Sequence, residues 1–169
     1  MLTTKDLAGS YGRNLGNIQK VMDGITDSEC NYQPPFNSNC INWVLGHILN
    51  NRNRAIQFLG EKPILTEEQH KRYGYGSPPV CTAEPGVLTV GQMMELLLES
   101  QPRIEAGMAA ISAAELAREV EYARRKMTVE QALLMGVCHD FTHTGELTIL
   151  REAAVSCRPG PRGEEIYMP

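Results

Sequence analysis

Apolar residues recur at helical spacing in four stretches of the chain. The first stretch lies within residues 4–24, where apolar positions follow one another at spacings of three and four: Leu7, Tyr11, Leu15, Ile18 and Met22. This is the pattern of an amphipathic helix with one buried face. Similar spacings predict three more helices, at about Asn37 or Ser38 to Leu59, at 90–111, and at Thr128 to about Ser156.

Residues that begin and interrupt helices frame these patterns. Thr89-Val-Gly-Gln92 and Thr128-Val-Glu-Gln131 have the capping-box form, in which a hydroxyl and an amide side chain satisfy free backbone N–H groups of the first turn. Pro102 is predicted to kink or break the third helix, because proline removes a backbone hydrogen bond. Val120-Glu-Tyr122 is typical of a short extended segment, for which we predict no strand partner.

The connection between the second and third helices is long. Residues 60–88 contain four prolines and four glycines, which predicts an irregular segment with at most a short helix after Thr66. A connection of this length favours a crossover over a hairpin turn. The sequence therefore predicts an all-α fold, a four-helix bundle with a long crossover connection between helices 2 and 3. We expect residues 1–156 to form this one domain and residues 157–169 to be a poorly ordered tail.

Composition excludes some function classes. The net charge is −4, and Arg124-Arg125-Lys126 is the only basic cluster, so we expect no nucleic-acid partner. No apolar run approaches the roughly 20 residues that span a bilayer, so we expect no membrane-spanning role. Five cysteines without a C-x-x-C pair, in a chain without an N-terminal signal pattern, predict reduced thiols and the cytoplasm.

The fourth helix is also apolar away from one face. Its second apolar side is formed by Leu133, Leu134, Val137 and Phe141. A helix that is hydrophobic on two sides needs two packing partners, which makes a homodimer a reasonable expectation.

Three histidines carry the strongest chemical signal. His139 and His143 stand four residues apart, so they project from one side of the fourth helix and can share one metal ion. His47 lies on an apolar stripe of the second helix, and His139 and His143 lie on an apolar stripe of the fourth, so we expect the three imidazoles to converge in the interior. The first stripe also carries Trp43, Val44, Ala55 and Phe58, and the second also carries Ala132, Met135, Gly136 and Leu150.

Other readings of these residues stay open. The histidine pair alone is equally compatible with two polar residues bonded to backbone or to a carboxylate. Glu146 is a candidate fourth ligand, general base or acceptor from an imidazole N–H. Asn51 and Arg54 follow His47 on its stripe and are candidates to bind an anionic group of a substrate, although Arg54 can equally pair with an acid. Cys138 is predicted to be a buried, inert thiol.

Two segments resemble the DinB-like superfamily of metal-binding four-helix bundles. They are Trp43-Val-Leu-Gly-His47-Ile and His139-Asp-Phe-Thr-His143-Thr-Gly-Glu146-Leu, and Thr128-Val-Glu-Gln-Ala132 is similar to that family's opening of the last helix. The likeness covers about residues 5 to 155. It implies that His47, His139 and His143 bind a divalent metal, commonly zinc or nickel, and that homodimers are common. Glu146 departs from the family, where glutamine is frequent.

Three neutral imidazoles leave a coordination position open, which is typical of a reactive site. Our first hypothesis is a transferase in which the metal holds a low-molecular-weight thiol cosubstrate as its thiolate, for attack on a small-molecule electrophile. The second is a metal-dependent hydrolase with Glu146 as general base. The third is a non-catalytic structural or sensor bundle.

Overall fold

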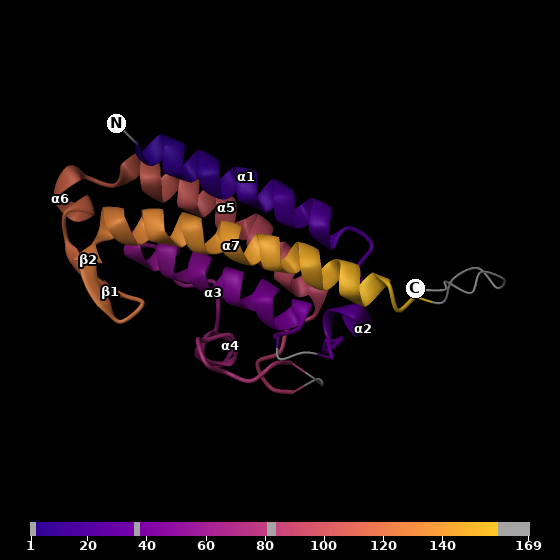
Figure 1. Ribbon diagram of the computed structural model, residues 1–169. Coiled ribbons are helices and arrows are strands. Elements are labelled where there is room, and N and C mark those ends of the chain that lie inside the picture. Colours follow the sequence, from indigo (N-terminus) through magenta and orange to yellow (C-terminus); the bar gives the residue numbers. More distant parts are fainter. Residues whose placement is uncertain (1–2, 36–37, 81–83, 159–169) are drawn as a thin grey trace.

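Four long helices pack side by side in the computed structural model, which describes residues 3–35, 38–80 and 84–158 (Figure 1). These are α1 (Thr4–Met22), α3 (Ile41–Phe58), α5 (Val90–Ala110) and α7 (Val129–Val155). Shorter elements connect them: α2 (Asp27–Cys30), α4 (Glu67–Arg72), α6 (Ala113–Leu116), β1 (Glu119–Tyr122) and β2 (Arg125–Thr128). The predicted four-helix bundle is confirmed. None of the described helices has both the length and the apolar character needed to cross a membrane.

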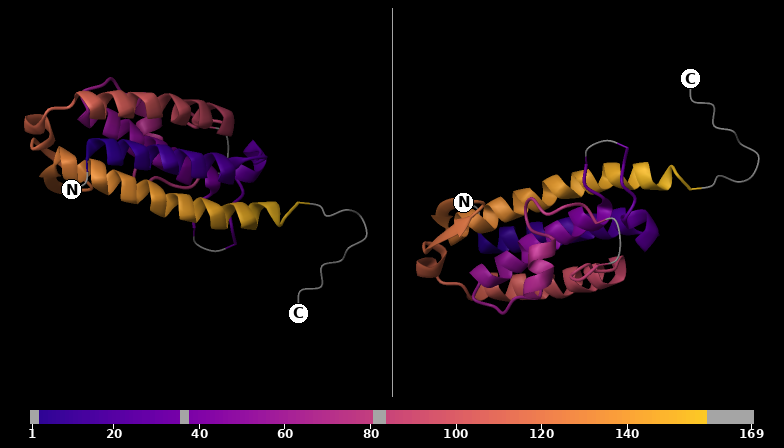
Figure 2. Two further views of the ribbon diagram at one scale, coloured as in Figure 1. Left: turned by 90° about the horizontal axis from the view of Figure 1, so that it is seen from above. Right: turned by 90° about the horizontal axis from the view of Figure 1, so that it is seen from below.

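The long connection between α3 and α5 sets the topology. α1 and α7 run in one direction, whereas α3 and α5 both run in the opposite one, because the crossover returns the chain to the end where α3 began (Figure 1, Figure 2). α1 packs against α5 and α7, and α3 packs against the same two helices. The helices that carry the three histidines, α3 and α7, are therefore in direct contact.

Helix starts follow the sequence signals with one exception. Reciprocal capping boxes are present in α5, whose N-cap is Thr89, and in α7, whose N-cap is Thr128. α3 begins at Ile41, so the prediction of Ser38 as its N-cap is wrong, and Asn37 lies outside the described residues. Its N-cap is Cys40, which makes no side-chain capping bond and is fully buried. Tertiary packing fixes this start in place of a cap.

Pro102 was predicted to kink or break its helix; the break is absent, because α5 continues from Val90 to Ala110. Residues 119–122 do have a strand partner, because β1 pairs with β2 in an antiparallel hairpin at the end of the bundle where α7 begins (Figure 1). The hairpin escaped prediction because its two-residue turn is Ala123-Arg124 and lacks the glycine or asparagine of common hairpin turns. Beyond Arg158, the predicted tail lies outside the described residues.

The buried face of α7 is rotated relative to the predicted stripe. Gly136, Asp140 and Thr144 are buried along its centre. The two histidines lie beside this line and are half-buried, not deep in the interior. Consistent with the rotation, Cys138 is exposed, so the prediction of a buried thiol is wrong. Met135, predicted on the inner stripe, is also exposed.

A buried arginine joins the four long helices. Arg52 on α3 is fully buried and pairs with Asp140 on α7, with 3.1 Å between Nε and Oδ2. One terminal nitrogen donates to the Tyr11 carbonyl of α1 at 2.7 Å. The other donates to Ser100 Oγ and Gln101 Oε1 of α5, both at 3.3 Å. Every guanidinium nitrogen thus has an acceptor, which is the condition for burying this charge without a large cost.

We predict that Arg52→Met lowers the free energy of unfolding by about 3–5 kcal/mol, because Asp140 is left buried without its counter-charge. Urea denaturation followed by circular dichroism measures this loss. The double variant Arg52→Met/Asp140→Leu should regain most of it, since both charges are then gone. Arg103→Met is the matched control, because Arg103 pairs with Glu99 at the surface, where about 1 kcal/mol or less is at stake. An equally small loss in Arg52→Met would contradict this role.

Candidate metal centre

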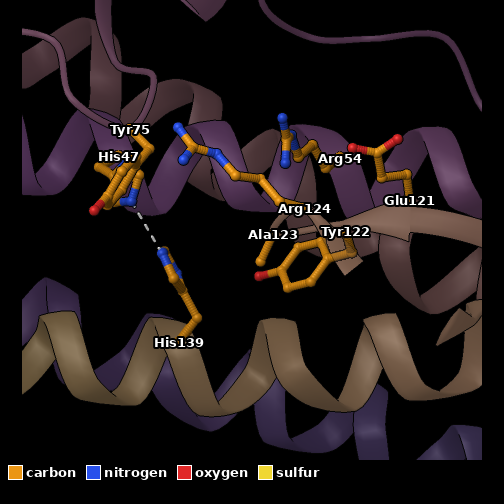
Figure 3. A pocket seen from close by; sticks show the side chains of 8 residues that line it. All are labelled: His47, Arg54, Tyr75, Glu121, Tyr122, Ala123, Arg124 and His139. Carbon is orange, nitrogen blue, oxygen red and sulfur yellow. Dashed lines mark hydrogen bonds between the residues drawn. The ribbon is translucent and has the colours of Figure 1, made fainter. Parts of the chain in front are cut away.

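Three imidazoles meet between α3 and α7. His47 comes from α3, and His139 and His143 come from adjacent turns of α7. One ligand nitrogen from each ring lies within 4.8 Å of the other two. The Nε2 atoms of His47 and His139 are 3.0 Å apart, and Figure 3 shows the two rings facing each other across the gap between the helices. The expected convergence of the three histidines is therefore present in the fold.

The other nitrogen of each ring faces an oxygen atom. His47 Nδ1 is 2.8 Å from the Tyr73 carbonyl, and His143 Nδ1 is 2.7 Å from Glu146 Oε2. His139 Nδ1 is 3.5 Å from Asp140 Oδ1. Carbonyl and carboxylate oxygens accept hydrogen bonds only, so Nδ1 carries the proton in His47 and His143 and leaves a lone pair on Nε2. This is the usual arrangement around metal-binding histidines.

The donor set fits a divalent cation. Two Nε2 lone pairs facing each other at 3.0 Å repel, unless a cation or a proton lies between them. Two imidazoles bound to one tetrahedral ion at about 2.0–2.1 Å have their nitrogens about 3.3 Å apart, close to this separation. His47, His139 and His143 are the residues that would hold such an ion.

His47 is held by the residues around it. Its ring stacks on Trp43 with 4.6 Å between centroids, and the Trp43 indole donates to Ser77 Oγ at 2.8 Å. Gly46 gives room to the crossover, because a Cβ there would lie 2.1 Å from Tyr73 Cδ1. The glycine thus lets Tyr73 bring its carbonyl to the His47 ring. This explains why tryptophan, glycine and histidine occur together in this segment.

Burial keeps His47 neutral. It lowers the pKa of the imidazole from 6.5 to about 4, and the neighbouring His139 and His143 add to the effect, while the hydrogen bond to the Tyr73 backbone opposes it. Above that pH the ring is uncharged and has a lone pair for a metal ion.

Asn51 is buried, and both polar atoms of its side chain form hydrogen bonds. Its amide nitrogen donates to the Gly136 carbonyl at 3.0 Å and to Asp140 Oδ1 at 2.7 Å. Its oxygen accepts from the Tyr122 hydroxyl at 2.7 Å. Burial raises the pKa of Tyr122 to about 12, which keeps that hydroxyl a donor. Asn51 therefore links α3, α7 and the hairpin, and it does not line the cavity beside the histidines.

A cavity of about 620 Å³ opens beside His47 and His139. Its lining includes Arg54, the predicted anion-binding residue, together with residues that the sequence did not single out for function: Tyr75, Glu121, Tyr122, Ala123 and Arg124 (Figure 3). The volume is within the range of small-molecule sites. Tyr75 belongs to the proline- and glycine-rich connection and Arg124 to the Arg124-Arg125-Lys126 cluster, but no local signal in the sequence shows that these two segments meet.

The family model described as the DinB superfamily matches residues 11–147. The chain belongs to the DinB superfamily. Two solved structures agree with the fold. A conserved protein from Enterococcus faecalis is 14% identical with a TM-score of 0.69, and the match covers 92% of this chain and 99% of that one. YfiT from Bacillus subtilis is 19% identical with a TM-score of 0.64, over 88% and 86% of the two chains. No curated protein matches the sequence.

In this DinB-superfamily chain, Glu146 lies beside His143 on α7. Its Oε2 accepts a hydrogen bond from His143 Nδ1 at 2.7 Å, and the other nitrogen of that ring faces the site. That position fits an acceptor that orients the imidazole.

The metal-free DinB-superfamily protein should lose stability as the pH falls from about 6.5 to about 4. Over this interval unfolded His47 takes up a proton and folded His47 does not, so acid favours the unfolded state. Thermal unfolding in chelator-treated buffer measures the trend. His47→Gln removes the titrating ring, and its melting temperature should fall less over the same range. Identical pH profiles for the two proteins would contradict the neutral state of His47.

Proposed function

We propose that the protein is a divalent-metal-dependent transferase that uses a low-molecular-weight thiol. His47, His139 and His143 bind one ion, with zinc or nickel the expected metals. The observation that supports this most is the pair of Nε2 atoms facing each other at 3.0 Å, with oxygen acceptors behind the rings. When bound, the ion supplies a Lewis acid that lowers the pKa of a coordinated thiol or water.

The residues around the ion hold and orient the reactants. Tyr73 and Glu146 accept from the rings of His47 and His143 and fix their direction, and Asp140 Oδ1 lies 3.5 Å from His139 Nδ1. The cavity beside His47 and His139 has room for a small-molecule electrophile and a thiol together. A purely structural metal site needs no such cavity, which favours catalysis over a non-catalytic bundle.

The position of Glu146 favours a thiol over water as the nucleophile. Hydrolysis at a metal centre commonly needs a free base to take the proton of water. Glu146 is occupied by its bond to His143, and Glu121 lies across the cavity from His139, beyond Arg54 (Figure 3). A thiol needs less help, because coordination to a cation is enough to deprotonate it.

The cobalt-substituted protein gives a direct test. We expect one cobalt per chain, and a new sulfur-to-metal charge-transfer absorption when mercaptoethanol is added. His143→Ala should lose the metal and the absorption, because two imidazoles remain. His70→Ala is the matched control, since His70 lies on α4 outside the cluster and its loss should change neither. An unchanged spectrum at saturating mercaptoethanol would rule out thiol activation.

Hydrolysis is the second candidate, because YfiT from Bacillus subtilis is described as a probable metal-dependent hydrolase. Glu146→Gln separates the two reactions. The glutamine oxygen can still accept from His143, so a thiol transferase should keep its charge-transfer band, with metal affinity reduced by about tenfold to 100-fold at most. A hydrolase that depends on Glu146 as base should lose turnover while binding metal. Hydrolysis of a model ester by the wild type that Glu146→Gln abolishes, with no thiol band in either protein, would favour the hydrolase.

We also propose that the protein forms a homodimer through the outer face of α7. Large apolar side chains are exposed along that helix: Leu134, Met135, Phe141 and Ile149. A row of this kind on one helix favours burial against a second copy. Sedimentation analysis of the full chain measures the assembly.

A further inference from the structure

The turn of the β1–β2 hairpin holds an arginine in a strained conformation. Ala123 and Arg124 have φ angles of 51° and 63°, in the left-handed region. A residue with a side chain costs about 1–2 kcal/mol there, so hairpin turns of this kind usually contain glycine, asparagine or aspartate. Such strain persists where the surrounding structure fixes it, and it concentrates at binding sites.

The strained turn places Arg124 in the wall of the cavity. Its guanidinium lies over the ring of Tyr75, 5.5 Å from the centroid, although Tyr75 is otherwise 85% exposed. The hairpin and the crossover loop thus meet through these two side chains at the edge of the cavity (Figure 3).

Arg54 enters the same cavity from α3. It lies seven residues after His47, so the two side chains share a helix face about 10 Å apart along the axis. Among the described residues, neither Arg54 nor Arg124 forms an ion pair with a carboxylate. This is notable in a chain with a net charge of −4. With Glu121 as the one carboxylate in the lining, the cavity wall carries an excess positive charge.

We infer that Arg54, about two helical turns from His47 on α3, and Arg124, whose guanidinium lies over Tyr75, bind a carboxylate of the reacting small molecule. The inference rests on the proposed function, because it assigns the substrate class of the same site. Guanidinium groups suit carboxylates, which they bind through paired N–H donors. The molecule therefore has an anionic end at Arg54 and Arg124 and a reactive end at His47 and His139. The carboxylate belongs either to the thiol or to its electrophile.

Matched ligands test the charge. Zinc-loaded protein is titrated by calorimetry with mercaptooctanoate and with mercaptooctanol, whose chains span about 10 Å and differ only at the far end. We expect the carboxylate to bind at least about tenfold more tightly than the alcohol, a difference of about 1.4 kcal/mol. Arg124→Gln should abolish that preference.

Arg125→Gln is the matched control, because this substitution removes the same charge from the next residue, which lies exposed on β2 outside the cavity. Its preference for the carboxylate should stay intact. Arg124→Gly is a second variant that also relieves the strained φ angle, so it should lose the preference while unfolding at the same or a higher temperature. Equal preference in wild type and Arg124→Gln, or equal loss in Arg125→Gln, would overturn the inference.

Octanoate, which has no sulfur, tests the carboxylate site apart from the metal. It should compete with mercaptooctanoate, and it should bind to protein already saturated with mercaptoethanol, with the same dependence on Arg124. Octanoate titrations of metal-free protein keep the two proposals apart, because arginine-dependent binding there supports the carboxylate site even if no thiol binds the metal.

Discussion

The buried contact between Arg52 and Asp140 is the constraint on which the arrangement depends. Arg52 reaches α1, α5 and α7 from α3, so one guanidinium fixes the relative positions of all four long helices. Asp140 receives Asn51 and Arg52 on its two oxygens, and Oδ1 also faces His139 Nδ1. Because both charges are buried, only a narrow range of helix positions satisfies them. The same range brings the imidazoles together.

The bundle therefore places the three-histidine cluster at its edge. His139 precedes Asp140 in sequence, so anchoring the carboxylate in the core turns the histidine toward α3 and the cavity. Glycine at two positions permits the close packing: a Cβ at Gly136 would lie 2.4 Å from the Tyr11 hydroxyl, and Gly46 makes room for Tyr73. The three half-buried rings can thus meet a solute, whereas a site deep in the core would exclude one.

The sequence was sufficient for the parts with local signals. Capping boxes at Thr89 and Thr128 marked helix starts, and the spacing of His139 and His143 marked a shared face. The sequence was insufficient where contacts between residues distant in the chain determine the structure. Arg52 lies within five consecutive polar residues of α3, and no local signal shows that the three other long helices surround it. The hairpin lacks the usual turn residues, and the face of α7 was misjudged because Asp140, a charged residue, occupies its buried centre.

X-ray absorption spectroscopy of the zinc-loaded full chain can decide whether the three histidines bind one ion, because it counts the ligands of the ion by element and distance. We predict one zinc per chain with three imidazole nitrogens at about 2.0–2.1 Å and a light-atom ligand from solvent. Sulfur ligands from the cysteines, fewer than three imidazoles, or zinc that dialyses away from the folded protein would contradict it.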